Sequence, residues 1–322
     1  MSLIKIENLV KDYPLPKKHL FRKAPVFRAL HGINLEIEQG DSFGIVGESG
    51  CGKSTLARIV MALDEPTSGT VYYNGVDLFR ASGKEVREMR KYFQMVFQDP
   101  YSSLNPRKKI LAIVSEPLDM LEKSILRSNR KKRVQSILKE VGMNPEDMGK
   151  YPHEFSGGQR QRIAIARALI TKPSLIVADE AVSALDVSVQ AQVLNLIMDL
   201  QEKYNLTLMF ISHDLSVIEF ITHKLAVIYL GKIVEQGDTA RVFENPRHPY
   251  TKLLLSAIPS VDPDVKNRSI NEINPDLSSL EHIAGRGCSF IDRCSLATQL
   301  CREHTPGLMG DDHHKYACHN AL

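Results

Sequence analysis

The chain has 322 residues, which is enough for one large domain and a smaller additional part. Its 41 Lys and Arg residues nearly balance its 38 Asp and Glu residues, and a net charge of +3 does not favour a nucleic-acid-binding protein. No apolar run reaches the roughly 18 residues needed to span a bilayer, and the N-terminus does not resemble a signal peptide. We therefore expect a cytoplasmic protein, and other polypeptides would form any membrane channel that it serves.

The first 97 or so residues are predicted to form mainly strands and turns, with one helix. Polar and apolar residues alternate over Met1–Val10 and over Ile33–Ile37, which is typical of strands with one buried face. Phe43–Val46 is a short apolar strand that ends at a glycine-rich segment, Gly47–Thr55. A helical pattern, Leu56–Leu63, follows this segment directly.

Residues from about 99 to 168 are predicted to be mostly helical, and strands return after residue 170. A helix is expected at Val187–Glu202, and the expected strands are Leu175–Ala178, Leu206–Ile211, Leu225–Leu230 and Lys232–Glu235. Apolar strands that alternate with helices indicate an α/β domain with a largely parallel core sheet. We expect residues 1–255 to form this domain, with a helical subdomain inserted at about 99–168 and a C-terminal appendage at 256–322.

The glycine-rich segment matches the pattern of a phosphate-binding loop, or P-loop. Its residues are Gly47, Glu48, Ser49, Gly50, Cys51, Gly52, Lys53, Ser54 and Thr55. Glycines let backbone N–H groups converge on phosphates, and the N-terminus of the following helix adds partial positive charge. Lys53 can supply a full charge to the β- and γ-phosphates, and the Ser54 hydroxyl can ligate Mg²⁺.

A pair of acidic residues, Asp179 and Glu180, follows the apolar strand Leu175–Ala178. An Asp at the end of such a strand fits the carboxylate that helps to hold Mg²⁺ in P-loop proteins. Glu180 can polarise an attacking water as a general base. Together with the P-loop, this pair predicts a nucleotide hydrolase.

A second group of small and polar residues stands before the helical run Arg160–Leu169: Phe155, Ser156, Gly157, Gly158 and Gln159. A hydroxyl and free N–H groups at a helix start form another anion site. One chain needs only one site for a γ-phosphate. The second site therefore suggests that the nucleotide is shared across a dimer.

The order of these motifs resembles that of ABC transporter ATPases, over roughly residues 1–260. Phe155–Gln159 is similar to the LSGGQ signature of that family, with Phe in place of Leu. The resemblance implies that Tyr13 stacks on adenine, that Gln98 contacts Mg²⁺ and water, and that His213 lies near the γ-phosphate. For Tyr13, an ordinary surface aromatic residue is the alternative. The resemblance also implies a D-loop across the dimer, formed by Ser183, Ala184, Leu185 and Asp186.

Three segments are similar to one group within the family, the dipeptide and oligopeptide permease ATPases and their F-type subunit in particular: Phe97–Pro106, Asp186–Gln192 and His248–Thr251. This resemblance implies a P-loop NTPase fold and an ATP-hydrolysing subunit of a peptide importer, peripheral on the cytoplasmic face of the membrane. The implied partners are a second related ATPase subunit, two membrane permeases and an extracytoplasmic solute-binding protein. The alternatives are the same importer type for nickel complexes or glutathione-like solutes, and a soluble ABC ATPase outside transport.

Four cysteines lie close together near the C-terminus: Cys288, Cys294, Cys301 and Cys318. Their spacing is wider than the cysteine pairs of structural zinc sites, and four thiolates suit an iron–sulfur cluster. Resemblance to peptide-permease ATPases implies a 4Fe–4S cluster here, while zinc and free thiols stay open as alternatives. ATP and Mg²⁺ are the other expected ligands.

Overall fold

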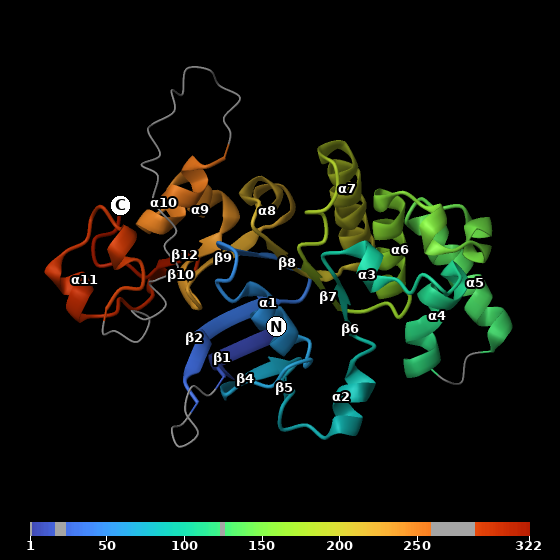
Figure 1. Ribbon diagram of the computed structural model, residues 1–322, viewed down its shortest axis with the longest axis horizontal. Helices are drawn as coiled ribbons and strands as arrows, with labels where there is room; N and C mark the ends of the chain where they lie inside the picture. The colour runs from blue at the N-terminus through green and yellow to red at the C-terminus, as the bar shows by residue number, and fades with distance from the viewer. Residues whose placement is uncertain (1, 17–23, 123–125, 259–286) are drawn as a thin grey trace.

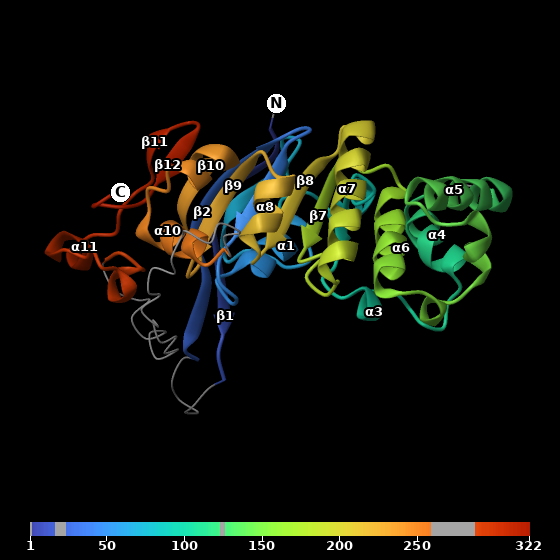
Figure 2. The ribbon, with the colours of Figure 1, turned by 90° about the horizontal axis from the view of Figure 1, so that it is seen from above.

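The computed structural model describes residues 2–16, 24–122, 126–258 and 287–322. These residues form two sheets, with a lobe of helices at one end and the C-terminal residues at the other (Figure 1). Figure 2 shows from above that the helical lobe and the C-terminal residues stand on opposite sides of the sheets.

The N-terminal sheet is antiparallel, and its strands in spatial order are β2 (Val26–Glu38), β1 (Ser2–Pro14), β4 (Ser68–Tyr73) and β5 (Val76–Asp77). Ile4 and Ile6 of β1 are buried, as the alternation predicts. Ile6 pairs with Leu35 of β2 and with Val71 of β4. The sheet therefore presents one apolar face to the rest of the molecule.

The core sheet continues through the described residues in the order β11–β12–β10–β9–β3–β8–β7–β6. Its strands are β3 (Ser42–Val46), β6 (Phe93–Val96), β7 (Leu175–Asp179), β8 (Thr207–Ser212), β9 (Lys224–Tyr229), β10 (Lys232–Asp238), β11 (Met309–Asp311) and β12 (His314–Tyr316). The strands β6, β7, β8, β3 and β9 pair in parallel. The carboxyl ends of these five strands therefore share one edge of the sheet.

The parallel strands are buried on both faces, which explains why they are apolar throughout. In β8, Leu208 and Phe210 belong to one core, whereas Met209 and Ile211 belong to the other, because successive side chains point to opposite faces. The second core lies between the core sheet, the N-terminal sheet and α1 (Lys53–Val60). The first core is covered by α7 (Val187–Tyr204), α8 (Leu215–Ile221), α9 (Thr239–Glu244) and α10 (Pro249–Ser256).

The helical lobe is inserted between β6 and β7 (Figure 1). It contains α3 (Pro100–Ser103), α4 (Ile110–Leu121), α5 (Arg127–Glu140), the 3₁₀ turns η1 (Pro145–Gly149) and η2 (Pro152–Glu154), and α6 (Gly157–Leu169). The helix α4 packs on both α5 and α6. A separate short helix, α2 (Gly83–Met89), precedes β6 and begins with a capping box at Ser82.

The C-terminal residues return to the core sheet. β12 pairs with β10, placing Tyr316 opposite Glu235, and β11 pairs with β12. Between residue 287 and β11, the chain forms the 3₁₀ turn η4 (Ile291–Arg293) and α11 (Gln299–Glu303). The sequence predicts an appendage from residue 256, and β11 and β12 within that part extend the main sheet. The segment 259–286 of that predicted appendage lies outside the described residues.

Across the described parts of the chain, no helix is both long enough and apolar enough to cross a membrane.

Candidate active site

The P-loop joins the end of β3 to the start of α1 and depends on glycine at two close approaches. Gly47 has φ 152°, and a Cβ there would lie 2.2 Å from the carbonyl oxygen of Ile228. Gly52 has φ 107°, and a Cβ there would lie 2.7 Å from the carbonyl oxygen of Ala29. Any other residue at these positions would push the loop away from β9 and β2.

Lys53 is the first residue of α1, and its side chain is buried under the P-loop. Its ammonium Nζ donates to the carbonyl oxygens of Gly47 at 2.6 Å and of Glu48 at 2.9 Å. Gly52 caps α1 without a side-chain hydrogen bond, so the first N–H groups of the helix are open to an anion. The loop thus combines a cation and free N–H groups, as the sequence predicts for phosphate binding.

Ser54, the second residue of α1, faces Asp179, the last residue of β7. The Ser54 hydroxyl donates to Asp179 Oδ1 at 3.2 Å. Burial is the main cause that raises the pKa of the Asp179 carboxyl; the Ser54 hydrogen bond opposes this rise and the neighbouring Glu180 adds to it. A hydroxyl beside a poorly solvated carboxylate is a donor set that suits Mg²⁺.

Gln98, Glu180 and His213 meet at the same edge of the sheet. The Gln98 amide Nε2 donates to Glu180 Oε2 at 2.8 Å, and His213 Nδ1 lies 3.3 Å from Glu180 Oε1. Glu180 has φ 50°, a left-handed conformation that is rare for this residue type, and its N–H donates to Ile211 O at 2.9 Å. The structure therefore brings all three predicted catalytic side chains together around one carboxylate.

Tyr13 of β1 lies close to Thr55, the last residue of the P-loop. Its hydroxyl donates to Asp64 Oδ2 at 2.8 Å, and the Lys11 ammonium lies 4.9 Å from its ring centre. Burial raises the pKa of the Tyr13 hydroxyl, the Asp64 bond adds to the rise, and a hydrogen bond with Thr55 opposes it. These contacts hold the Tyr13 ring beside Thr55 of the P-loop.

The predicted signature residues begin α6, and the structure does not place them near the P-loop. Figure 1 shows α6 in the helical lobe, apart from α1. Ser156 is the N-cap of α6: its Oγ accepts from Gln159 N at 3.4 Å, while Gln159 Oε1 accepts from Ser156 N at 3.0 Å. Ser156 and Gln159 are exposed, whereas Phe155 is buried in the first core.

The predicted D-loop, Ser183–Asp186, links the site on β7 to this signature. The Ser183 hydroxyl donates to the Glu180 carbonyl at 2.9 Å, and a Cβ on Gly157 would lie 3.5 Å from Leu185. A Cβ on Gly158 would lie 2.3 Å from Val189 of α7, so glycine is required for this packing.

Two residues that support the P-loop are not among those predicted from the sequence. Tyr250 of α10 is fully buried, and its hydroxyl accepts from the Glu48 N–H at 2.9 Å. Arg293 of η4 donates from its two terminal nitrogens to the two Glu48 carboxylate oxygens, at 2.8 Å each. No local pattern could have indicated their contacts with Glu48, because they lie 202 and 245 residues from it in the sequence.

The four predicted metal-binding cysteines line one cavity beside α10, together with Phe290: Cys288, Cys294, Cys301 and Cys318. Burial raises the pKa of the Cys288, Cys294 and Cys318 thiols, and neighbouring cysteines add to the rise. Among the residues that the structure describes, no three His, Cys, Asp or Glu side chains are arranged to hold a metal ion. Cys51, a residue of the P-loop, is buried and does not line this cavity.

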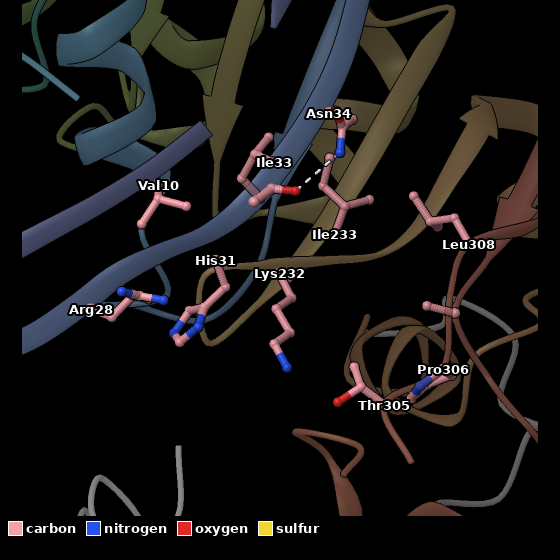
Figure 3. A pocket seen from close by; sticks show the side chains of 12 residues that line it. Val10, Arg28, His31, Ile33, Asn34, Lys232, Ile233, Thr305, Pro306 and Leu308 are labelled. Carbon is pink, nitrogen blue, oxygen red and sulfur yellow. Dashed lines mark hydrogen bonds between the residues drawn. The ribbon is translucent and has the colours of Figure 1, made fainter. Parts of the chain in front are cut away.

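A second cavity, of about 510 Å³, lies between β2, β10 and the C-terminal residues. Figure 3 shows Arg28, His31 and Lys232 on one side of this cavity, with Thr305 and Pro306 on the other. Burial, then the charges of Lys232 and Arg28, lower the pKa of His31 to about 4. None of the predicted nucleotide-binding residues lines this cavity.

Comparisons with known proteins agree on one family. The family model for ABC transporters matches residues 30–183, and the model for the oligopeptide/dipeptide transporter C-terminal region matches residues 234–301. The dipeptide transport ATP-binding protein DppF of Haemophilus influenzae is 47% identical over 95% of this chain and 92% of its own length. The oligopeptide transport ATP-binding protein AppF of Bacillus subtilis is 44% identical over 99% of this chain and 97% of its own.

Solved structures give the same result for the fold. A dimeric cassette of a bacterial ABC transporter matches with a TM-score of 0.64 and 31% identity, covering 73% of this chain and 98% of that one. A dimeric ATP-binding cassette in a post-hydrolysis state, bound to ADP and phosphate, matches with a TM-score of 0.65 and 30% identity over the same shares.

Proposed function

Because this chain belongs to the family of ATP-binding subunits of dipeptide and oligopeptide ABC transporters, we propose that it hydrolyses ATP to drive peptide uptake. The peptides would pass through separate membrane permease subunits. The observation that carries this proposal is the convergence of Gln98, Glu180 and His213 beside the Ser54–Asp179 pair at the end of the P-loop. This arrangement supports a role for Glu180 as a general base beside the position that the γ-phosphate of a P-loop nucleotide would take.

Each side chain has a distinct part in the proposed reaction. The P-loop N–H groups and Lys53 bind the phosphates, and Tyr13 stacks on the adenine ring. The Glu180 carboxylate accepts a proton from the attacking water, and Gln98 orients both groups through its hydrogen bond to Glu180. His213 donates to the charge that develops on the γ-phosphate.

Mg²⁺ would be held by the Ser54 hydroxyl and the Asp179 carboxylate, with Gln98 close by. The 3.2 Å separation of the two oxygens and the raised pKa of the Asp179 carboxyl suit a cation at this position. The ion would neutralise charge on the β- and γ-phosphates.

The second half of the nucleotide site would come from another ATPase subunit. The α6 cap, with the exposed Ser156 and with Gly158, would approach the γ-phosphate bound by the partner's P-loop, and the D-loop Ser183–Asp186 would lie between them. We propose a related but different chain as the partner, together with two permeases and an extracytoplasmic solute-binding protein. The protein would then work on the cytoplasmic face of the membrane.

The cysteine-lined cavity is a proposed site for a 4Fe–4S cluster. The support is that four thiols from separate segments line one cavity, which suits a group with four thiolate ligands. A structural role fits better than a catalytic one, since the cysteines do not reach the nucleotide site. Iron and sulfide assays on anaerobically purified protein test this proposal, and loss of both in a Cys301→Ser variant would support it.

The proposed division of the chain follows from these sites. Residues 1–255 would form the ATPase domain, with the helical subdomain at about 99–168. Residues 256–322 would carry the cysteines.

Uptake of a radiolabelled tripeptide by cells is the test of function. Cells that carry Lys53→Ala in place of the wild-type chain should lose ATP-dependent tripeptide uptake, while uptake of a free amino acid stays normal. Normal tripeptide uptake in these cells would contradict the proposal.

A further inference from the structure

Glu48 of the P-loop is held by three separate contacts. Its N–H donates to the Tyr250 hydroxyl at 2.9 Å, and its carbonyl oxygen accepts from Lys53 Nζ at 2.9 Å. Its carboxylate accepts two 2.8 Å hydrogen bonds from Arg293. The same residue therefore touches α10, the phosphate-binding lysine and the C-terminal residues that carry the cysteines.

Arg293 is fixed in place by its own surroundings. Its guanidinium lies 5.8 Å from the ring centre of Tyr229 and 5.7 Å from that of Phe290. Phe290 is buried and packs against the rings of Tyr229 and Tyr250. A guanidinium held by aromatic rings loses little freedom when it forms a forked ion pair.

This ion pair differs from an ordinary surface pair in geometry and in position. The Arg293 side chain is 22% exposed, and both of its terminal nitrogens bind Glu48. Planar, two-bond pairs of this kind fix direction as well as distance. The pair therefore limits how far the Glu48 backbone can move, and with it the carbonyl oxygen that contacts Lys53.

We propose that Arg293 is a positioning residue for ATP binding: through Glu48, it holds the P-loop in the shape that places Lys53 under the phosphates. Because Arg293 directly precedes Cys294, the affinity for MgATP depends on the segment that forms the cysteine-lined cavity. This inference rests on the proposed ATPase function. It adds a contact to the nucleotide site from a part of the chain that carries no nucleotide-binding motif.

A double-mutant cycle on the purified full chain tests the inference, with the Kd for MgATP measured by calorimetry. Arg293→Met and Glu48→Gln should each raise the Kd about 3- to 10-fold, since each removes a partly exposed but bidentate charge pair. The double variant should be no weaker than the weaker single variant, because both lose the same interaction. Arg293→Lys, which keeps the charge but not the fork, should fall between wild type and Arg293→Met.

Two further measurements separate positioning from a merely structural role. In steady-state assays, Arg293→Met should raise the KM for ATP and leave kcat unchanged, because Arg293 does not touch the reacting atoms. The matched control is Arg133→Met, which removes an ion pair with Glu122 in the helical lobe and should leave the Kd unchanged.

Two results would overturn the inference alone. One is a Kd for Arg293→Met equal to that of wild type, even if the melting temperature and the binding stoichiometry fall. The other is additive losses in the double-mutant cycle. If the wild-type chain itself fails to bind MgATP, the proposed function is wrong and the inference falls with it.

Discussion

The two predicted anion sites of this chain, the P-loop edge of the core sheet and the N-terminus of α6, are built in different ways. At the P-loop edge, side chains that follow β3, β6, β7 and β8 converge on Glu180 and Asp179. At α6, one capping box formed by Ser156 and Gln159 organises the helix end within four residues. The first site requires the whole sheet, and the second requires only one turn of helix.

The two sites also differ in the chemical groups that they offer. The P-loop edge combines a buried lysine, free N–H groups and a carboxylate that can act as a base. The α6 cap offers the exposed Ser156, within a capping box in which Ser156 and Gln159 each accept a hydrogen bond from the other's N–H. Under the proposed function, this cap would contact a nucleotide bound by another subunit.

The largest expected effect falls on the P-loop edge. Glu180→Gln should lower the rate of ATP hydrolysis about 10²- to 10⁴-fold, the usual contribution of a general base, without weakening MgATP binding. A phosphate-release assay measures the rate, and calorimetry measures binding. Undiminished hydrolysis by the variant would mean that Glu180 is not the base.

A substitution that removes packing in the helical lobe should destabilise the lobe without changing nucleotide binding at the P-loop. Leu138 of α5 is fully buried, so Leu138→Ala should lower the free energy of unfolding of the lobe by about 2–5 kcal/mol. The Kd for MgATP of the isolated chain should stay constant, because no P-loop contact is lost. Hydrogen exchange measures the protection of backbone amides in the lobe. A parallel loss of protection in α1 would show that the lobe and the P-loop region unfold as one unit.

Lowering the pH should destabilise the part of the fold that supports the P-loop. Burial lowers the pKa of His248 to about 4, from 6.5 in the unfolded chain, and its Nδ1 accepts a hydrogen bond from Tyr250 N at 3.0 Å. Between pH 4 and pH 6.5 the unfolded state binds more protons at His248 than the folded state does. The stability that neutral His248 contributes is therefore fully present above pH 6.5 and is lost as the pH falls towards 4. Between pH 6.5 and pH 5, protonation of His248 in the unfolded state should lower the free energy of unfolding by about 2 kcal/mol.

Thermal or urea unfolding at several pH values measures this loss. His248→Asn keeps a residue that caps helices well but cannot titrate, so its stability should fall less on acidification. His31, whose pKa is also about 4, should act in the same direction. The exposed His153 provides the control variant, His153→Asn. An unchanged pH dependence in His248→Asn would contradict the assignment.

The smallest expected effect is on the α6 cap. Ser156→Ala should lower unfolding free energy by about 1 kcal/mol, the usual value for a lost N-cap, whereas Ser156→Asp should keep the cap. Both variants should slow hydrolysis in the assembled transporter, Ser156→Asp more strongly because its charge repels phosphate. Neither should change MgATP binding by the isolated chain, and a weaker Kd in either would show that α6 acts within its own chain.

Much of the fold follows from local patterns. The strands that begin near Phe43, Leu175 and Leu225 are within two residues of their expected starts, because buried parallel strands require unbroken apolar runs. The return of β11 and β12 to the core sheet could not be predicted in the same way. These strands are three residues each, and their burial pattern does not distinguish them from loops.

The sequence by itself determined the chemistry of the P-loop and the cap of α6, because each is a contiguous pattern of glycines, a hydroxyl or a lysine at a helix start. Only the tertiary structure decided that Gln98 and His213 meet Glu180, and that Tyr250 and Arg293 support Glu48. The physical reason is that parallel strands and a returning C-terminus bring distant residues into contact. Such contacts depend on strand order, which no local pattern records.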